Sequence, residues 1–276
     1  MLMKIRISSF FLLLFATVGG YAAGENIPVG GRSSAMGGIS VSQNDFWSIS
    51  NNQAGAAWFK GVTAGLYAEN RFLMKELMVQ QIGIALPLKA GTFALLVSHS
   101  GNNLYNEIKA GLSYARKFGK HFAVGVQIDY LRIHIKDDYG SKNLLSCEIG
   151  LMYHADQHMN IGIHLINPVP VHITAYPAEL LPTIICVGLS YQFSDAFVAA
   201  IEAEKDLEHR PLFRAGAEYR FTKPFLARIG IATNPMSFTF GFGLETGRIK
   251  IDISSEYNQA LGFSPSVSII YSFSPK

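Results

Sequence analysis

Apolar and polar side chains alternate along most of the chain after residue 58. Residues 213–221, FRAGAEYRF, show the pattern clearly: apolar or aromatic side chains occupy every odd position, and three charged side chains and a glycine occupy the even positions. Successive side chains of a β-strand point to opposite faces of the sheet, so this alternation predicts a strand with one apolar and one polar face. Residues 237–246 and 248–257 alternate in the same way.

Fourteen segments of this kind follow one another to the end of the chain. Most are about ten residues long, which is the length of a tilted strand that crosses a bilayer. The predicted strands are 60–69, 76–87, 91–99, 106–116, 121–135, 143–155, 159–167, 182–193, 196–205, 211–221, 225–233, 237–246, 248–257 and 265–273.

The connections between the predicted strands differ in length. Those after even-numbered strands are short, as in LKAG and TGR, and those after odd-numbered strands tend to be longer, with TNPMS as the exception. Short turns at one end and longer loops at the other are typical of outer-membrane barrels, whose short turns lie in the periplasm. A soluble β-sandwich also alternates, but it places its apolar face inside. We therefore predict an all-β fold, a closed antiparallel transmembrane β-barrel of about 14 strands, formed by residues 59–276.

In such a barrel the apolar faces meet lipid and the polar faces point into the lumen. The inward charges are of both signs, so they form either a structural network of salt bridges or the lining of a polar permeation path. Glu218 and Arg228, on adjacent predicted strands, favour the network. The predicted lumen charge network comprises Arg214, Glu218, Arg220, Arg228, Glu245, Lys250, Asp252 and Glu256.

The N-terminus has the features of an export signal. Lys4 and Arg6 precede the apolar run FFLLLFATVGG, and small residues follow at positions 22–24. This combination predicts a signal peptide, residues 1–23, that is removed on export. A transmembrane anchor would need a longer apolar core. With the barrel pattern, the signal predicts an integral protein in the outer membrane of a Gram-negative bacterium, in contact with outer-membrane lipid.

Residues 24–58, between the signal and the first strand, do not alternate and are rich in Gly, Ser and Asn. They would form either a plug, or hatch, inside the lumen or a flexible periplasmic arm. The stretches GGRSSAMGG and NDFWSISNNQAG resemble the N-terminal signature of PorV/PorQ-like proteins, which belong to the broader FadL-type (long-chain fatty-acid transporter) barrels. The matching positions are Arg32, Met36, Gly37, Gly38, Asp45, Asn52, Ala54 and Gly55, while Gln53 stands where the family usually has proline. The resemblance implies a fourteen-stranded barrel with an N-terminal hatch.

Composition and charge narrow the function further. A net charge of +3, with no basic cluster, gives no support for nucleic-acid binding. The alternation puts Cys147 on the face of Ile149 and Cys186 on the opposite face of the sheet, so the two cysteines are expected to be free thiols.

Candidate chemical sites are few. His154, Asp156 and His158 have side chains that bind zinc or copper, but they lie in a predicted turn without a further ligand. Asp137 and Asp138 lack the regularly spaced oxygen ligands of a calcium loop. No G-x-S-x-G motif is present, and the eight histidines are scattered. We predict no enzyme activity, no catalytic residues, no metal and no cofactor.

The loop NPVPVHITAYPAELLP is stiffened by prolines and is apolar for a segment facing water. An exposed apolar patch marks a surface for a partner or a hydrophobic ligand, whereas the same residues packed together would form a lid over the barrel. The residues of interest are Pro168, Val169, Pro170, Val171, Ile173, Tyr176, Leu180 and Leu181.

Two functions follow from these observations. Relatives of the PorV type serve protein secretion, so the resemblance implies a non-enzymatic accessory subunit of a larger outer-membrane protein export or assembly complex. The alternative is a FadL-like transporter that binds a hydrophobic small molecule and moves it across the outer membrane. The charged inward side chains favour the accessory role, because a transporter of apolar molecules would need an apolar inner strip.

Overall fold

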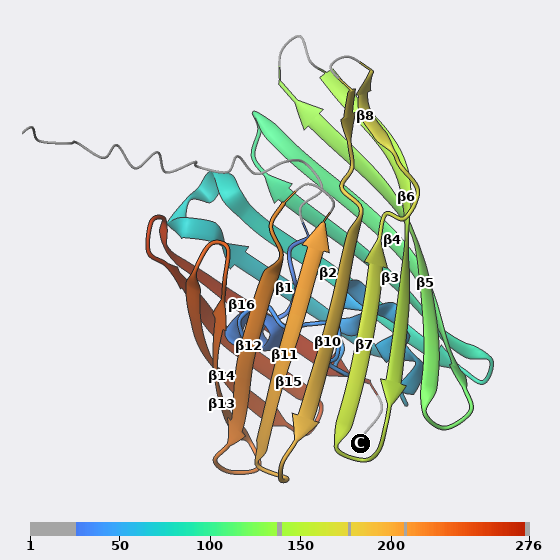
Figure 1. Ribbon diagram of the computed structural model, residues 1–276, viewed down its shortest axis with the longest axis vertical. Coiled ribbons are helices and arrows are strands. Elements are labelled where there is room, and N and C mark those ends of the chain that lie inside the picture. The colour runs from blue at the N-terminus through green and yellow to red at the C-terminus, as the bar shows by residue number, and fades with distance from the viewer. Residues whose placement is uncertain (1–25, 137–139, 176–177, 207–208, 274–276) are drawn as a thin grey trace, which may run out of the picture.

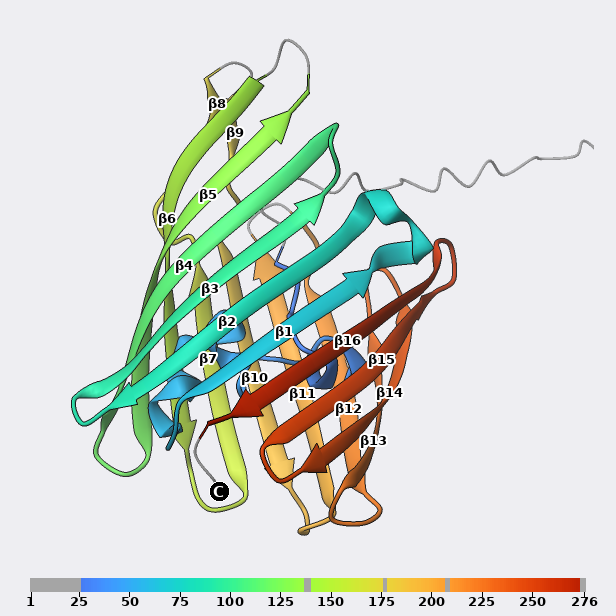
Figure 2. The same cartoon turned by 180° about the vertical axis from the view of Figure 1, so that it is seen from behind.

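The computed structural model describes residues 26–136, 140–175, 178–206 and 209–273. Fourteen of its strands form one closed antiparallel barrel, in which each strand pairs with its neighbours along the chain and the last pairs with the first (Figures 1 and 2). The predicted fold class is therefore confirmed. The barrel strands are β1 (Thr63–Asn70), β2 (Met78–Leu88), β3 (Gly91–Gly101), β4 (Tyr105–Phe118), β5 (Phe122–Ile135), β6 (Gly140–His154), β7 (Met159–Ile166), β10 (Ile184–Gln192), β11 (Phe197–Asp206), β12 (Leu212–Arg220), β13 (Phe225–Ala232), β14 (Ser237–Thr246), β15 (Ile249–Asn258) and β16 (Gly262–Ser272).

The alternation along the strands sorts side chains between the two faces of the wall. On β12, Phe213 and Tyr219 are 56% and 47% exposed on the outer face, whereas Arg214 and Glu218 are buried inside. Apolar side chains of the other strands, such as Phe242 and Leu145, cover the outer surface in the same way. An apolar outer band suits lipid, and closure pairs the backbone groups of every strand, as a structure surrounded by hydrocarbon requires.

The connections are less asymmetric than the sequence predicts. The end that carries connections 89–90, 119–121 and 247–248 is called here the turn end, and the opposite end the loop end. At the loop end, connections 102–104 and 259–261 contain three residues each, because β3, β4, β15 and β16 continue into segments predicted as loop. The predicted tendency toward longer connections at this end is present but weaker than expected, and connections 71–77 and 167–183 are its clear cases.

Two of these connections have structure of their own. Connection 71–77 holds the 3-10 helices η2 (Arg71–Leu73) and η3 (Lys75–Leu77). Connection 167–183 holds a two-stranded sheet of β8 (His172–Ala175) and β9 (Ala178–Leu180), which stands at the top of the barrel in Figure 1 beside the long strands β5 and β6. Among the described residues, the helices are all too short to cross a membrane.

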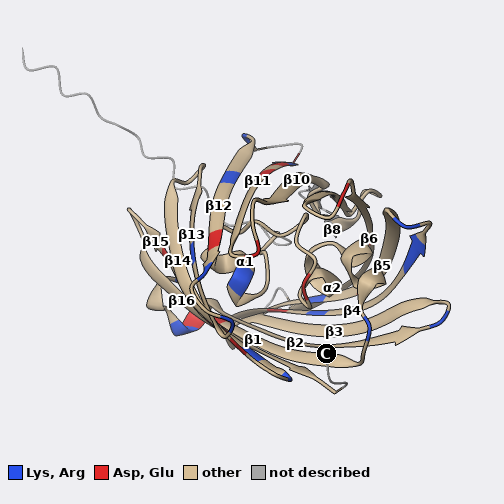
Figure 3. Ribbon diagram, turned by 90° about the horizontal axis from the view of Figure 1, so that it is seen from below, with Lys and Arg blue, Asp and Glu red and all other residues tan. Residues whose placement is uncertain are grey.

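The described residues before the barrel, 26–58, are called here the N-terminal segment. They contain the helices α1 (Gly31–Ala35) and α2 (Ser48–Asn51) and the 3-10 helix η1 (Gln53–Trp58), and Figure 3 shows α1 and α2 within the ring of strands. Helix α1 ends at Ala35, with Met36 as its C-cap, and the Gly38 N–H donates to the Ser33 carbonyl at 2.9 Å. Gly37 and Gly38 have φ of 76° and 81°, and this left-handed backbone turns the chain away after the helix.

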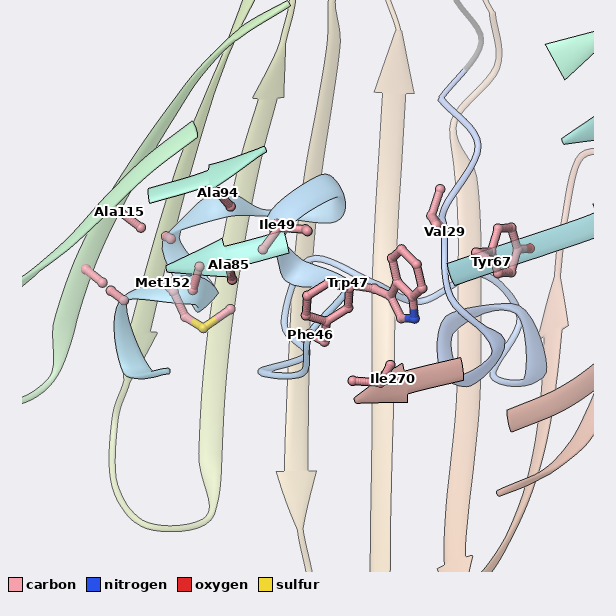
Figure 4. Packing of buried hydrophobic residues seen from close by; sticks show 14 residues of the cluster. Val29, Phe46, Trp47, Ile49, Tyr67, Ala85, Ala94, Ala115, Met152 and Ile270 are labelled. Atoms are coloured by element: carbon pink, nitrogen blue, oxygen red, sulfur yellow. The ribbon is translucent and has the colours of Figure 1, made fainter. Parts of the chain in front are cut away.

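A hydrophobic core joins this segment to the barrel wall (Figure 4). Trp47, 1% exposed, packs edge-on against Phe46 and against Tyr67 of β1, with ring centroids 5.0 and 5.9 Å apart. The wall contributes mostly small side chains, namely Ala85, Ala94, Ala115 and Ala123. The large side chains of the N-terminal segment therefore fill space that the wall leaves inside the barrel.

Candidate functional site in the lumen

Arg32 of α1 connects the N-terminal segment to the barrel wall. Its Nε and Nη2 donate to the two carboxylate oxygens of Glu218 on β12, both at 2.9 Å, and its Nη1 lies 3.6 Å from Asp45. Burial lowers the pKa of Arg32, but the Glu218 and Asp45 carboxylates raise it by more, so the guanidinium stays charged. Two residues of the resemblance motif, Arg32 and Asp45, thus meet each other in the structure.

The rest of the motif also contacts the inner wall. Met36 is fully buried, and the Gly37 N–H donates to the Thr239 hydroxyl of β14 at 2.7 Å. Asn52 donates to the carbonyls of Val41 and Leu151 at 2.7 and 3.0 Å. Ala54 and Gly55, in η1, are buried as well.

Gln53, which replaces the usual proline of the motif, has a role that the sequence did not reveal. Its Nε2 donates to Glu148 of β6 at 2.6 Å. A proline would have no side-chain donor, so this chain gains a buried contact with the wall at the position where it departs from the motif.

Eight glycines of the wall face the N-terminal segment and form four directly opposed pairs on neighbouring strands. The pairs are Gly65–Gly83, Gly125–Gly150, Gly162–Gly188 and Gly216–Gly230, and they are called here the glycine belt. A methyl group added at any of them would lie no more than 2.7 Å from an atom of the N-terminal segment. The missing side chains therefore let the segment lie directly against the backbone of the wall.

The predicted lumen charges gather into a buried cluster and a rim. Arg228 donates to Glu218 at 2.5 Å and to Asp252 at 2.7 Å, and Glu218 also binds Arg32. Near the turn end, Glu245 pairs with both Arg220 and Lys250 at 2.9 Å. Glu256 takes part in neither group.

A second buried cluster involves carboxylates outside the predicted set. Arg214 binds Glu202 and Glu204 at 2.8 and 2.9 Å, and Glu202 also accepts the backbone N–H groups of Ser40 and Val41. Glu204 also accepts from the Asn26 side chain at 2.9 Å, whereas the partners of Glu202 in the N-terminal segment are backbone groups. Such contacts leave no residue-type signal in the sequence.

A third cluster lies around Glu148. This carboxylate accepts from Lys109 at 2.5 Å, from Gln53 and from His164 at 3.0 Å. The Lys109 ammonium also lies 3.5 Å from Asp129. In all three clusters side chains of opposite sign are paired, as a structural network requires.

The loop predicted as a partner or ligand surface divides into two parts. Leu181 is 5% exposed and packs with Val171 on Leu131, Ile133 and Leu144, which point inward from β5 and β6. Val169, Pro170 and Leu180 are exposed, and Pro168 is half-buried. The side chains of Ile173 and Tyr176 lie outside the described residues.

Asn167 holds the two ends of this loop together. Its Nδ2 donates to the Leu181 carbonyl at 2.8 Å, and its own carbonyl accepts from the Thr183 hydroxyl at 2.7 Å. Its φ of 50° is left-handed, a conformation that asparagine tolerates better than most residues. Leu181 is thereby fixed over the inner face of β5 and β6.

Beneath Leu181 lies a cavity of about 130 Å³, called here the loop-end cavity. It is bounded by the inner faces of strands β2 to β7, by Asn26, Ile27 and Val29, and by the loop. A wider basin of about 640 Å³ lies at the turn end, lined in part by Arg32, Asp45 and Lys250.

The candidate metal ligands of the sequence have other partners. His154 stacks on Trp58 with ring centroids 3.8 Å apart, and Asp156 accepts the backbone N–H groups of His158 and Met159. Those two hydrogen bonds lower the pKa of Asp156. Asp137 and Asp138 lie outside the described residues.

The two cysteines are free thiols on opposite faces of the wall. Cys147 lies opposite the outward-facing Ile128 of the neighbouring strand β5, whereas Cys186 is buried in the lumen. Cys186, Glu202 and Glu204 stand close enough to hold a metal ion. Arg214 already binds both carboxylates, so the donor set is that of an ion-pair cluster.

Neither a known family model nor a curated protein sequence matches this chain. Solved structures do match. The CymD monoaromatic hydrocarbon channel is similar with a TM-score of 0.73 at 15% identity, over 90% of this chain and 98% of that one. The toluene transporter TbuX of Ralstonia pickettii has a TM-score of 0.71 at 13% identity, over 90% and 100%. A FadL homologue of Pseudomonas aeruginosa has 0.70 at 12%, over 91% and 100%. The chain therefore has the fold of FadL-type outer-membrane transporters.

Proposed function

We propose that this protein is an outer-membrane channel for small molecules with a hydrophobic body, and that the N-terminal segment is the plug of its lumen. The observation that carries the proposal is the match, along nearly the full length of each chain, to structures described as a hydrocarbon channel and a toluene transporter. From the sequence, the charged lumen favoured the accessory role over a transporter. We now prefer the transporter, because those charges pair with one another and with the N-terminal segment.

The positions of the two hollow regions support a route through the barrel. The loop-end cavity and the turn-end basin lie on either side of the N-terminal segment, which contributes Val29 to the first and Arg32 to the second. A molecule that passes between them must displace part of this segment. In this proposal the buried contacts of Arg32, Gln53 and the glycine belt hold the plug closed.

The test is uptake of labelled toluene by Gram-negative cells that express the protein. Ser146 lines the loop-end cavity, and its neighbour Leu145 is 68% exposed on the outer face of the same strand. Ser146→Phe would fill the cavity, whereas Leu145→Phe adds the same ring outside. We expect expression to raise the initial uptake rate, Ser146→Phe to remove most of the increase and Leu145→Phe to leave it. Equal uptake by the two variants, or no increase on expression, would refute the proposal.

The accessory role in a larger export or assembly complex is the second candidate. Its support is the set of apolar side chains exposed at the loop end, where Leu73, Met74 and Val169 are 62%, 49% and 61% exposed. Such a surface suits a protein partner. Isolation of the tagged protein in mild detergent should then recover a much larger barrel in stoichiometric amount, and deletion of residues 168–182 should weaken the association.

A further inference from the structure

The loop-end cavity contains buried polar groups whose hydrogen-bonding capacity the protein does not use. Gln81, Asp129 and Asn167 all line it and are 5%, 0% and 3% exposed. Within the described residues, Gln81 Nε2, Asp129 Oδ2 and Asn167 Oδ1 have no hydrogen-bond partner. A buried polar group without a partner costs about 1–3 kcal/mol, so three around one cavity point to an occupant that pairs with them.

The cavity favours positive charge at Asp129. Lys109 is its lining cation, and its ammonium lies 2.5 Å from Glu148 but 3.5 Å from Asp129 Oδ2. Glu148 has two further donors, Gln53 and His164. Among the described residues, Asp129 accepts one hydrogen bond, from Gln127 to Oδ1 at 2.8 Å, and its Oδ2 has only the longer ion pair with Lys109. Asp129 Oδ2 is therefore an acceptor that a protonated amine would satisfy.

The rest of the cavity lining is mixed, with serines and Glu107 beside apolar side chains. Val79, Leu131, Ile166 and Leu181 contribute hydrocarbon surface to the lining. The volume of about 130 Å³ is close to the roughly 150 Å³ of an apolar protein cavity that binds benzene. An organic body of about one ring therefore fits, with its polar group directed at Asp129.

We propose that the loop-end cavity binds a small amphipathic amine, with an apolar body of about one ring and a protonated amino group that donates to Asp129 and Asn167. This rests on the proposed channel function and names the class of its substrate. The Gln81 amide offers the donor for an acceptor on the same molecule.

The experiment compares four one-ring probes that differ in one substituent: benzylamine, benzyl alcohol, toluene and benzoate. The mature full-length protein is reconstituted in lipid nanodiscs, and binding is measured by equilibrium dialysis against nanodiscs without protein, which corrects for partition into lipid. We expect benzylamine to bind at least about ten-fold more tightly than toluene, benzyl alcohol to lie between them and benzoate to bind most weakly, because a charge-assisted hydrogen bond is about twice as strong as a neutral one.

Substitutions test whether the preference for benzylamine arises in the loop-end cavity. Asp129→Asn should weaken benzylamine binding at least ten-fold and change toluene binding little, whereas Asp195→Asn, which removes the same charge from an exposed turn, should change neither. If Asp129→Asn does not fold, Gln81→Leu serves instead and should weaken benzyl alcohol more than toluene.

The outcomes separate the two proposals. Toluene binding as tight as benzylamine binding, or an Asp129→Asn variant that keeps the amine preference, would overturn the amine site while the toluene-uptake test still supports the channel. Binding of none of the probes above the lipid control would show that water alone satisfies the three groups and would also overturn the site. Amine binding that depends on Asp129, in a protein that fails the uptake test, would support the site and refute the channel.

Discussion

The Arg32 guanidinium and the Glu218 carboxylate meet through two hydrogen bonds of 2.9 Å inside the barrel. One residue lies before the first strand and the other lies 186 positions later, on β12. Their side chains are 17% and 9% exposed, so water screens the pair only in part. Glu218 also holds Arg228, which makes this carboxylate the link between the N-terminal segment and the charges of the wall.

Removal of this pair should loosen α1 without unfolding the barrel. A double-mutant cycle with Arg32→Gln and Glu218→Gln should give a coupling energy of about 1–3 kcal/mol, because contacting residues in one buried network are strongly non-additive. The readout is the opening free energy from amide hydrogen exchange at Ser34 and Gly38, whose N–H groups bond within the α1 region.

The matched control for that cycle is the rim pair Arg220–Glu245, whose side chains are 33% and 21% exposed. A pair this accessible to water should contribute no more than about 1 kcal/mol. It should also leave exchange in α1 unchanged, since among the described residues the side-chain hydrogen bonds and ion pairs of Arg220 and Glu245 are to each other, to Lys223 and to Lys250. Additive effects of Arg32→Gln and Glu218→Gln would contradict a direct link.

Alanine substitutions in the glycine belt should destabilise the N-terminal segment by amounts that depend on the atoms the new methyl group meets. At Gly162 the new methyl would overlap the backbone carbonyl of Val41, whereas at Gly188 it would lie 2.7 Å from the Val41 side chain, which can rotate away. Gly162→Ala should therefore destabilise the N-terminal segment by about 1–3 kcal/mol and Gly188→Ala by less. Hydrogen exchange at residues 39–43 measures the effect.

Ile163→Ala is the control, because Ile163 follows Gly162 and points to the outer face, where it is 36% exposed. Its loss should leave exchange in the N-terminal segment as it was. An effect of Ile163→Ala equal to that of Gly162→Ala would mean that the strand, and not the close approach to Val41, is responsible.

The barrel could be predicted from the sequence because alternation is a local property of each strand. The alternation within residues 213–221 assigns the two faces of this strand without information from any other segment. Contacts between segments that are far apart in the sequence leave no such local pattern. Gln53 departs from the expected proline, and nothing in its neighbourhood reveals that it binds Glu148. The glycine belt could not be predicted from the sequence either, because each glycine occupies an ordinary inward position. Whether two glycines lie opposite each other depends on the register of the strands.

The loops show the same limit in another form. From its prolines and apolar residues, connection 167–183 was expected to be either an exposed surface or a lid over the barrel, and packing decides which of its side chains are covered. Leu180 and Leu181 are adjacent and equally apolar, yet the first is 44% exposed and the second 5%. Only the position of Leu131 and Leu144 beneath the loop distinguishes them.

Asp156 predicts a pH response confined to one turn. Its pKa lies below the ordinary 3.8 because the backbone N–H groups of His158 and Met159 stabilise the carboxylate. A carboxyl whose pKa is lower in the folded state stabilises the turn above the ordinary pKa, and this stabilisation is lost as pH falls through the lower value. Protection of the His158 and Met159 amides should therefore decrease below about pH 3.8. In Asp156→Asn, which keeps an acceptor oxygen without the charge, the pH dependence should disappear.

Leu181 and Val169 lie in the same connection and predict opposite outcomes on truncation. Leu181→Ala removes a buried side chain from the cluster with Leu131, Ile133 and Leu144, and buried leucine truncations cost about 2–5 kcal/mol. Because the Leu181 N–H donates to the Val171 carbonyl at 2.9 Å, its exchange rate reports opening of the loop. We expect Leu181→Ala to speed that exchange strongly and to raise access to the loop-end cavity. Val169→Ala, at a side chain 61% exposed, should change exchange by no more than about 0.5 kcal/mol. Similar exchange in the two variants would show that Leu181 does not hold the loop over the cavity.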